Sequence, residues 1–147
     1  MMLLDNARAR FEYEISETLV AGVVLGGGEV KSLRGKHGSL AGSFVKILGD
    51  EVWLVNAQIS PYPYANNIDY EPKRSRKLLL KRHEILKLKT EAQQKGRIMV
   101  PLRIEAMGPF IKVVIGIGRG RSTVDKRVVV RKREQQRELD RFIKNRR

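Results

Sequence analysis

Residues 97–120 read RIMVPLRIEAMGPFIKVVIGIGRG, and this stretch decides the fold class. Two apolar runs, residues 98–104 and 110–117, flank the segment Met107-Gly108-Pro109, whose Gly and Pro favour a turn. Apolar runs joined in this way predict a β-hairpin. Further upstream, residues 44–48 and 52–55 surround Gly49-Asp50-Glu51 and predict a second hairpin with a glycine in its turn.

Shorter patterns complete the body of the chain. Residues 11–15 alternate apolar and charged side chains, which is typical of a half-buried strand. Ile85, Leu88 and Ala92 have helical spacing before Gly96, a natural stop, and residues 29–34 predict another short helix. We therefore expect a mainly β fold, a small closed barrel rather than a sandwich, with two or three short helices.

The composition points to a polyanionic partner. The chain has 147 residues, 30 Lys and Arg, 16 Asp and Glu, and a formal net charge of +14. Such an excess favours nucleic acid. The sequence contains no cysteine, which excludes disulfides, thiolate zinc sites and cysteine nucleophiles. No apolar run is long enough to span a membrane, so we expect a cytoplasmic protein with no membrane partner.

The charge is concentrated at the C-terminal end. Residues 119–147 contain 12 basic and 4 acidic side chains, a net charge of +8, and few apolar residues. Such a segment cannot bury enough surface to fold alone. We therefore predict a folded domain over residues 1–118 and a basic tail over residues 119–147 that is disordered in isolation.

Signatures of enzymes are absent from the sequence. The glycine run at residues 26–28 lacks the Gly directly before Lys that a phosphate loop needs, and Val30 occupies that place. Gly116, Gly118 and Gly120 do not have the spacing of a dinucleotide loop. The acidic residues form no group typical of a nuclease's metal site. We predict a protein that is not an enzyme and needs no metal or cofactor.

The segment KRSRKLLLKR, residues 73–82, is the strongest binding signal, because six of its ten residues are cationic and none is acidic. Guanidinium groups match phosphate oxygens in pairs, and lysines add point charge. A solvated face without a partner is the alternative. Tyr62, Tyr64 and Tyr70 lie before this segment in a loop rich in Pro and Asn, where they either stack on bases or pack the loop onto the barrel.

Several blocks of sequence together resemble the tmRNA-binding protein family of bacteria, the SsrA-binding proteins. They are NARARFEYEI at residues 6–15, GEVKSLR at 28–34, ISPY at 59–62, PKRSRKLLL at 72–80 with EI at 84–85, VPL at 100–102, and GR at 120–121 with DKR at 125–127. The resemblance implies a barrel of the oligonucleotide-binding (OB) type and an accessory of trans-translation. Such proteins bind the tRNA-like domain of tmRNA at its elbow, in place of the missing anticodon arm. Their tail enters the empty mRNA channel of a stalled ribosome as a helix, and elongation factor Tu is an indirect partner through charged tmRNA.

The resemblance also suggests which residues carry these contacts. The tmRNA set is Val20, Lys31, Arg34, Lys73, Arg74, Arg76, Lys77, Leu79 and Lys81. The ribosome-binding set of the tail is Gly120, Arg121, Val124, Asp125, Lys126, Arg127, Phe142, Ile143 and Lys144. Three positions depart from the family's usual pattern: Val20 replaces Glu, Lys81 replaces His or Asn, and Val124 replaces an aromatic residue or His. The alternative function is a ribosomal or RNA-chaperone protein that binds rRNA generally.

Overall fold

The structure is a computed structural model. It describes the backbone of residues 1–121 and 123–145, and the side chains of all of these except residues 123–125 and 145. Its elements in chain order are β1 (Met2–Asp5), α1 (Ala7–Glu12), β2 (Tyr13–Val23), α2 (Gly27–Arg34), β3 (Gly38–Ser39), β4 (Phe44–Leu48), β5 (Glu51–Val55), β6 (Gln58–Ile59), β7 (Arg76–Leu79), α3 (Arg82–Ala92), β8 (Arg97–Met107), β9 (Phe110–Gly120) and α4 (Thr123–Asn145).

Seven strands form one strongly curved antiparallel sheet, in the order β1-β8-β9-β2-β7-β5-β4, and β3 pairs with β6 in a small second sheet. Both predicted hairpins are confirmed, as β8–β9 and β4–β5. The chain turns at Gly108 and Gly49, which have φ of 61° and 60°, a region that glycine adopts without strain. The fold is therefore mainly β, as the sequence predicted.

The sheet is not closed, so the prediction of a closed OB-type barrel is not confirmed. Among the described residues, β4 lies close to β8 but no strand pairing joins them. Asn6, directly before α1, bonds to β8: its N–H donates to the Leu102 carbonyl at 2.9 Å, and its Nδ2 donates to the Pro101 carbonyl at 2.8 Å. Pro101 itself has no N–H to donate to another strand.

Helix α1 is a feature that the sequence pattern did not predict. Residues 11 and 12 complete this helix, and the strand expected over residues 11–15 begins only at Tyr13. The Asn6 side chain caps the helix by accepting from Ala9 N–H at 3.3 Å. Ala9 is buried against Val100, Leu102 and Val114, on the sheet face opposite the main core. This packing favours helix over the local alternation.

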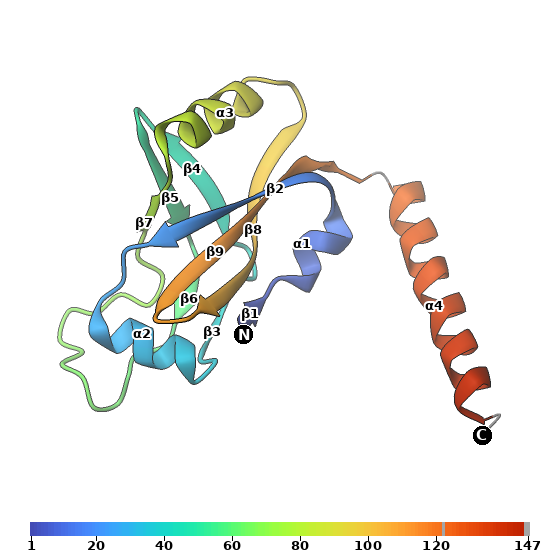
Figure 1. The fold of residues 1–147 in the computed structure, drawn as a ribbon, viewed down its shortest axis with the longest axis horizontal. Coiled ribbons are helices and arrows are strands. Elements are labelled where there is room, and N and C mark those ends of the chain that lie inside the picture. The colour runs from blue at the N-terminus through green and yellow to red at the C-terminus, as the bar shows by residue number, and fades with distance from the viewer. Residues whose placement is uncertain (122, 146–147) are drawn as a thin grey trace.

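The main core lies on the concave side of the sheet. Leu33 of α2 and Leu88 of α3 are fully buried there against strand residues such as Ile115 and Ile117. Figure 1 shows these two helices at opposite ends of the sheet. The two predicted helical segments, residues 29–34 and 85–92, are confirmed within α2 and α3.

Beyond the sheet, residues 123–145 form the long helix α4. Figure 1 places it to one side of the sheet, beyond α1. The Arg133 guanidinium lies 5.8 Å from the centre of the Phe11 ring of α1. Strand β9 continues to Gly120, two residues past the predicted boundary at residue 118. That the tail is disordered in isolation stays a prediction.

Candidate nucleic-acid interface

In strand β7, the side chains of the basic segment alternate between the two faces of the sheet. Successive side chains of a strand point to opposite faces. Arg76 and Leu78 are accordingly buried, with 0% and 3% of their surface exposed, while Leu79 is 53% exposed. Lys77 has the same orientation as Leu79. The run of cations is therefore not one continuous binding surface.

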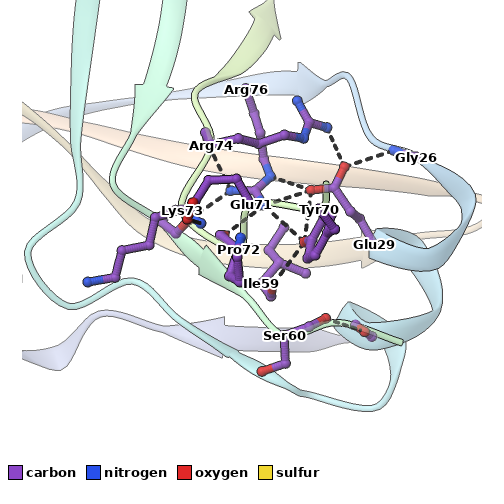
Figure 2. A network of polar contacts seen from close by, with 12 residues as sticks. Gly26, Glu29, Ile59, Ser60, Tyr70, Glu71, Pro72, Lys73, Arg74 and Arg76 are labelled. Atoms are coloured by element: carbon purple, nitrogen blue, oxygen red, sulfur yellow. Dashed lines mark hydrogen bonds and ion pairs between the residues drawn. The ribbon is translucent and has the colours of Figure 1, made fainter. Parts of the chain in front are cut away.

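Arg76 can be buried because its guanidinium pairs with the buried carboxylate of Glu29 in α2. Arg76 Nε donates to Glu29 Oε2 at 2.7 Å, and Arg74 Nη2 donates to Glu29 Oε1 (Figure 2). Gly26 N–H also donates to Glu29 Oε1, at 2.9 Å. Burial raises the pKa of Glu29, but the hydrogen bonds from Arg74, Gly26 and Arg76 outweigh it and leave that pKa below its ordinary value.

The remaining donors of Arg76 hold the loop that precedes β7. Its guanidinium donates to the carbonyls of Ala57 at 2.7 Å, Pro72 at 2.9 Å and Arg74 at 3.0 Å. It also donates to the hydroxyl of Tyr70 at 3.3 Å, and that hydroxyl donates to the Ile59 carbonyl at 2.8 Å (Figure 2). The predicted RNA contact of Arg76 is therefore wrong for this structure: the side chain is enclosed and organises the loop.

The outer face of β2, β7 and β9 brings other predicted residues together. Gly22 pairs with Leu79 on one side and with Lys112 on the other. A Cβ on Gly22 would lie 3.3 Å from Leu79 Cβ and 3.7 Å from Lys112 Nζ, so the glycine lets these side chains converge. Val20, 46% exposed, lies two residues before Gly22 and has the same orientation. We call Val20, Leu79, Lys81, Phe110 and Lys112 the outer face.

Lys81 follows directly on the β7 end of this face. The pairing of β2 with β7 ends at Gly22 and Leu79, and Lys81 comes two residues after Leu79. Lys81 is exposed and stands at the N-cap of α3, where its own N–H donates to Glu84 Oε1 at 2.9 Å. That Val20 and Lys81 share a surface stays a prediction.

Phe110 and Lys112 are members of the outer face that sequence reasoning missed. Phe110 is 63% exposed at the start of β9, and Lys112 Nζ lies 5.6 Å from the centre of its ring. The available signal was local: Lys112 is the one cation in the apolar run at residues 110–117. An exposed aromatic ring beside a cation is a suitable surface for an unstacked RNA base.

The other predicted cations of the body lie around this face and around α2. Lys31 Nζ lies 5.3 Å from the centre of the Tyr62 ring, and Arg34 Nη2 donates to the Pro109 carbonyl at 3.4 Å. Lys77 Nζ forms a long ion pair with Glu51 at 3.9 Å. Lys73 is exposed, and Arg74 is partly exposed while paired with Glu29. That these residues bind RNA stays a prediction.

The predicted tail residues are distributed along the end of β9 and α4. Gly120 ends β9, and Arg121 is held at the end of α1, where its N–H donates to the Glu12 carbonyl at 2.9 Å. Phe142 and Ile143, 59% and 54% exposed, lie near the far end of α4 with exposed Lys144. Lys126 is partly exposed and Arg127 exposed at its start. The side chains of Val124 and Asp125 lie outside the described residues.

Within the described residues, no group of three or more His, Cys, Asp and Glu side chains is placed to hold a metal ion. No described helix is both long and apolar enough to cross a membrane.

Comparison with known proteins decides the family. Residues 3–145 match the model of the family described as SmpB protein. The chain belongs to the SmpB family. This confirms the resemblance predicted from the sequence blocks, and the match extends from β1 to the end of α4.

The relatives of this SmpB chain match it over nearly its whole length. The SsrA-binding protein of Maricaulis maris (strain MCS10) is 47% identical over 141 residues, covering 95% of this chain and 90% of that protein. The SsrA-binding protein of Ligilactobacillus salivarius (strain UCC118) is 43% identical over 143 residues, covering 97% of this chain and 92% of that protein.

A solved chain has a similar fold. It comes from the structure described as "tmRNA-SmpB: a journey to the center of the bacterial ribosome". The two chains are 40% identical with a TM-score of 0.70, and the match covers 89% of this chain and 96% of that one. The two chains therefore share the same fold.

Proposed function

We propose that this protein binds the tRNA-like domain of tmRNA through its outer face and delivers it to stalled ribosomes for trans-translation. The observation that carries the proposal is the convergence of Val20, Leu79 and Lys112 from three strands on one exposed surface, in a chain of the SmpB family. Relatives of this chain are named SsrA-binding proteins.

The chemistry of the outer face suits a folded RNA elbow. Leu79 and Val20 offer apolar surface to unstacked bases, and Phe110 offers an aromatic ring. Lys112 and Lys81 supply cations for nearby phosphates. The buried bonds of Arg76 hold β7 and its preceding loop in place, so the exposed side chains of β7 are presented on a rigid support.

Helix α4 has the dimensions and charge of an arm for an RNA-lined channel. Its 23 residues span about 35 Å at 1.5 Å per residue. It carries eight Lys and Arg against four Asp and Glu, and Leu139, Phe142 and Ile143 lie at helical spacing i, i+3 and i+4. We propose that the tail occupies the empty mRNA channel, while the body takes the place of the anticodon arm. Elongation factor Tu would then be reached through charged tmRNA.

A competition experiment separates this function from general rRNA binding. The full-length protein is titrated with the tRNA-like domain of tmRNA against tRNA and an rRNA fragment, at about 150–200 mM salt because counterion release inflates non-specific affinity at low salt. We expect the tRNA-like domain to bind at least about tenfold more tightly, which corresponds to about 1.4 kcal/mol. Equal affinities for all three RNAs would support the general rRNA-binding alternative.

A second experiment separates the roles of sheet and tail. Truncation after Gly120 removes α4 but keeps every strand. We expect nearly unchanged affinity for the tRNA-like domain and loss of peptide tagging on stalled ribosomes. Phe142→Asp with Ile143→Asp keeps the tail's length and should also abolish tagging. Tagging by the truncated protein would contradict the role of the tail, and loss of tmRNA binding would contradict the division of labour.

A further inference from the structure

The loop between β6 and β7 presents two tyrosines that the outer face does not include. Tyr64 is 88% exposed, and its ring packs edge to face against that of Tyr62, with the ring centres 5.5 Å apart at an angle of 68°. The third tyrosine of this loop behaves differently: the Tyr70 hydroxyl bonds to Arg76, Glu29 and Ile59. Tyr70 is therefore structural, whereas the Tyr64 ring adds almost nothing to the core.

The tyrosines are presented by an organised loop. Asn67 Nδ2 donates to the Tyr62 carbonyl at 2.8 Å, and Ala65 N–H donates to the same carbonyl at 3.1 Å. At the base of the loop, Ile59 N–H donates to the Pro72 carbonyl at 3.0 Å. Figure 2 shows the base of the loop held by the ion cluster of Glu29 with Arg74 and Arg76. An aromatic ring on such a support loses little freedom when a partner stacks on it.

A cavity of about 350 Å³ lies beside Tyr62, between this loop and the start of α2. Its lining includes Gly27, Gly28, Tyr62, Ala65, Asn66 and Asn67. A Cβ on Gly28 would lie 3.1 Å from Ala65 Cβ, so the glycine lets the loop approach the helix. The volume is within the range of small-ligand sites, and amide side chains both donate and accept hydrogen bonds, as base edges require.

A lysine beside the Tyr62 ring suits an anionic ligand with an aromatic part. Lys31 Nζ lies 5.3 Å from the centre of the Tyr62 ring, and the Glu29 carboxylate is neutralised by two arginines. Arg74 and Arg76 are used by Glu29, and the other charged residues between 60 and 75 are Lys73, Asp69 and Glu71, so the cation for a ligand at this site is Lys31. A nucleotide combines a π-face for the exposed ring with a phosphate for the lysine.

We propose that Tyr62, Tyr64 and Lys31 form a second RNA contact, a stacking site for one unpaired nucleotide. The base stacks on the Tyr64 ring, its edge faces the asparagines of the cavity, and its phosphate lies near Lys31. This inference rests on the proposed function in that the partner is RNA, and the nucleotide belongs to tmRNA or to rRNA.

The test compares Tyr64→Ala, Tyr64→Phe and a matched control, Ile68→Ala, in the full-length protein. Ile68 is 79% exposed in the same loop but has no ring. Affinity is measured for two ligands, the tRNA-like domain of tmRNA and the vacant small ribosomal subunit. We expect Tyr64→Ala to weaken one of them about tenfold, and the other two variants to bind as the wild type does. The ligand that responds identifies the source of the nucleotide.

Ultraviolet crosslinking with mass spectrometry provides a direct readout. We expect a nucleotide attached to the peptide that contains Tyr62 and Tyr64. The inference is overturned if Tyr64→Ala binds both ligands like the wild type, if Tyr64→Phe loses as much as Tyr64→Ala, or if this peptide crosslinks only to protein.

Lys112→Ala distinguishes the failure of this inference from that of the proposed function. If Lys112→Ala weakens binding to the tRNA-like domain and Tyr64→Ala changes neither ligand, only the second contact is wrong. If neither variant affects any RNA, both proposals fail.

Discussion

Two cations that are neighbours on β7 have opposite environments. Arg76 is 0% exposed and donates to Glu29 and to the carbonyls of the loop before β7. The Lys77 side chain is 44% exposed and forms a long ion pair of 3.9 Å with Glu51, a carboxylate that is 52% exposed. The strand period places one cation inside and the other outside. In a basic segment of a sheet, alternate residues can therefore support the binding surface from behind while their neighbours form it.

The largest effect that follows from this contrast is on stability. Arg76→Met removes the guanidinium and leaves Glu29 and several carbonyls without their donors. Breaking a buried ion pair on one side costs about 3–5 kcal/mol, so we expect a loss of that order in the free energy of unfolding. Chemical denaturation measures it. Lys77→Met is the matched control and should stay within about 0.5 kcal/mol. Equal losses in unfolding free energy for the two variants would show that the buried Arg76 stabilises the fold no more than the exposed Lys77.

A smaller effect of the same cluster is a dependence of stability on pH. The hydrogen bonds to Glu29 hold its folded-state pKa below the ordinary value of 4.5. Its contribution is therefore fully present above the unfolded-state pKa and is lost as the pH falls from there through the folded-state pKa. We expect Glu29→Gln to be less stable at neutral pH and to lose less stability on acidification. Parallel pH profiles of unfolding for Glu29→Gln and the wild type would show that Glu29 is not the responsible carboxylate.

The elements that the sequence predicted are those whose determinants are close together in the chain. The β8–β9 and β4–β5 hairpins each need two apolar runs and a turn, and these are adjacent in sequence. The helical spacing before Gly96 likewise identified α3. Strand β7 was not recognised, because its four residues pair with β2 and β5, which are distant in the chain. The cations Arg76 and Lys77 also obscured the alternation of inward and outward side chains along this strand.

The candidate site was predictable only in part for the same reason. The basic segment at residues 73–82 indicated a binding surface, but the burial of Arg76 depends on Glu29, 47 positions away. Lys112 and Phe110 join Val20 and Leu79 only through the register of three strands. Asn6 likewise bonds to Pro101 of β8, 95 positions away, a contact that no local pattern encodes.

The outer face provides the next effect in size, on RNA binding. Lys112→Ala removes a cation beside Leu79 and Phe110 while leaving the core side of β9 intact. We expect about three- to tenfold weaker binding to the tRNA-like domain, and a smaller slope of log affinity against log salt by about 0.7–0.9. The measurement is a binding series at several salt concentrations.

Lys46→Ala serves as the control for this loss of charge, because Lys46 is an exposed cation on β4, at the far end of the strand order. An equal loss in both variants would mean that binding senses net charge and not this face.

The smallest expected effect concerns Lys77 itself, which lies on the same side of β7 as Leu79. An exposed lysine with a long ion pair contributes little to the free energy of unfolding. Any effect of Lys77 on RNA binding therefore comes from a phosphate that it contacts. We expect Lys77→Ala to weaken RNA binding about two- to threefold, with a small decrease in the salt slope and unchanged stability. Combining it with Lys112→Ala should add the two losses if the residues contact separate phosphates, since distant sites are additive. A salt slope identical to that of the wild type would make Lys77 a solvated charge, and the binding surface would then end at Leu79.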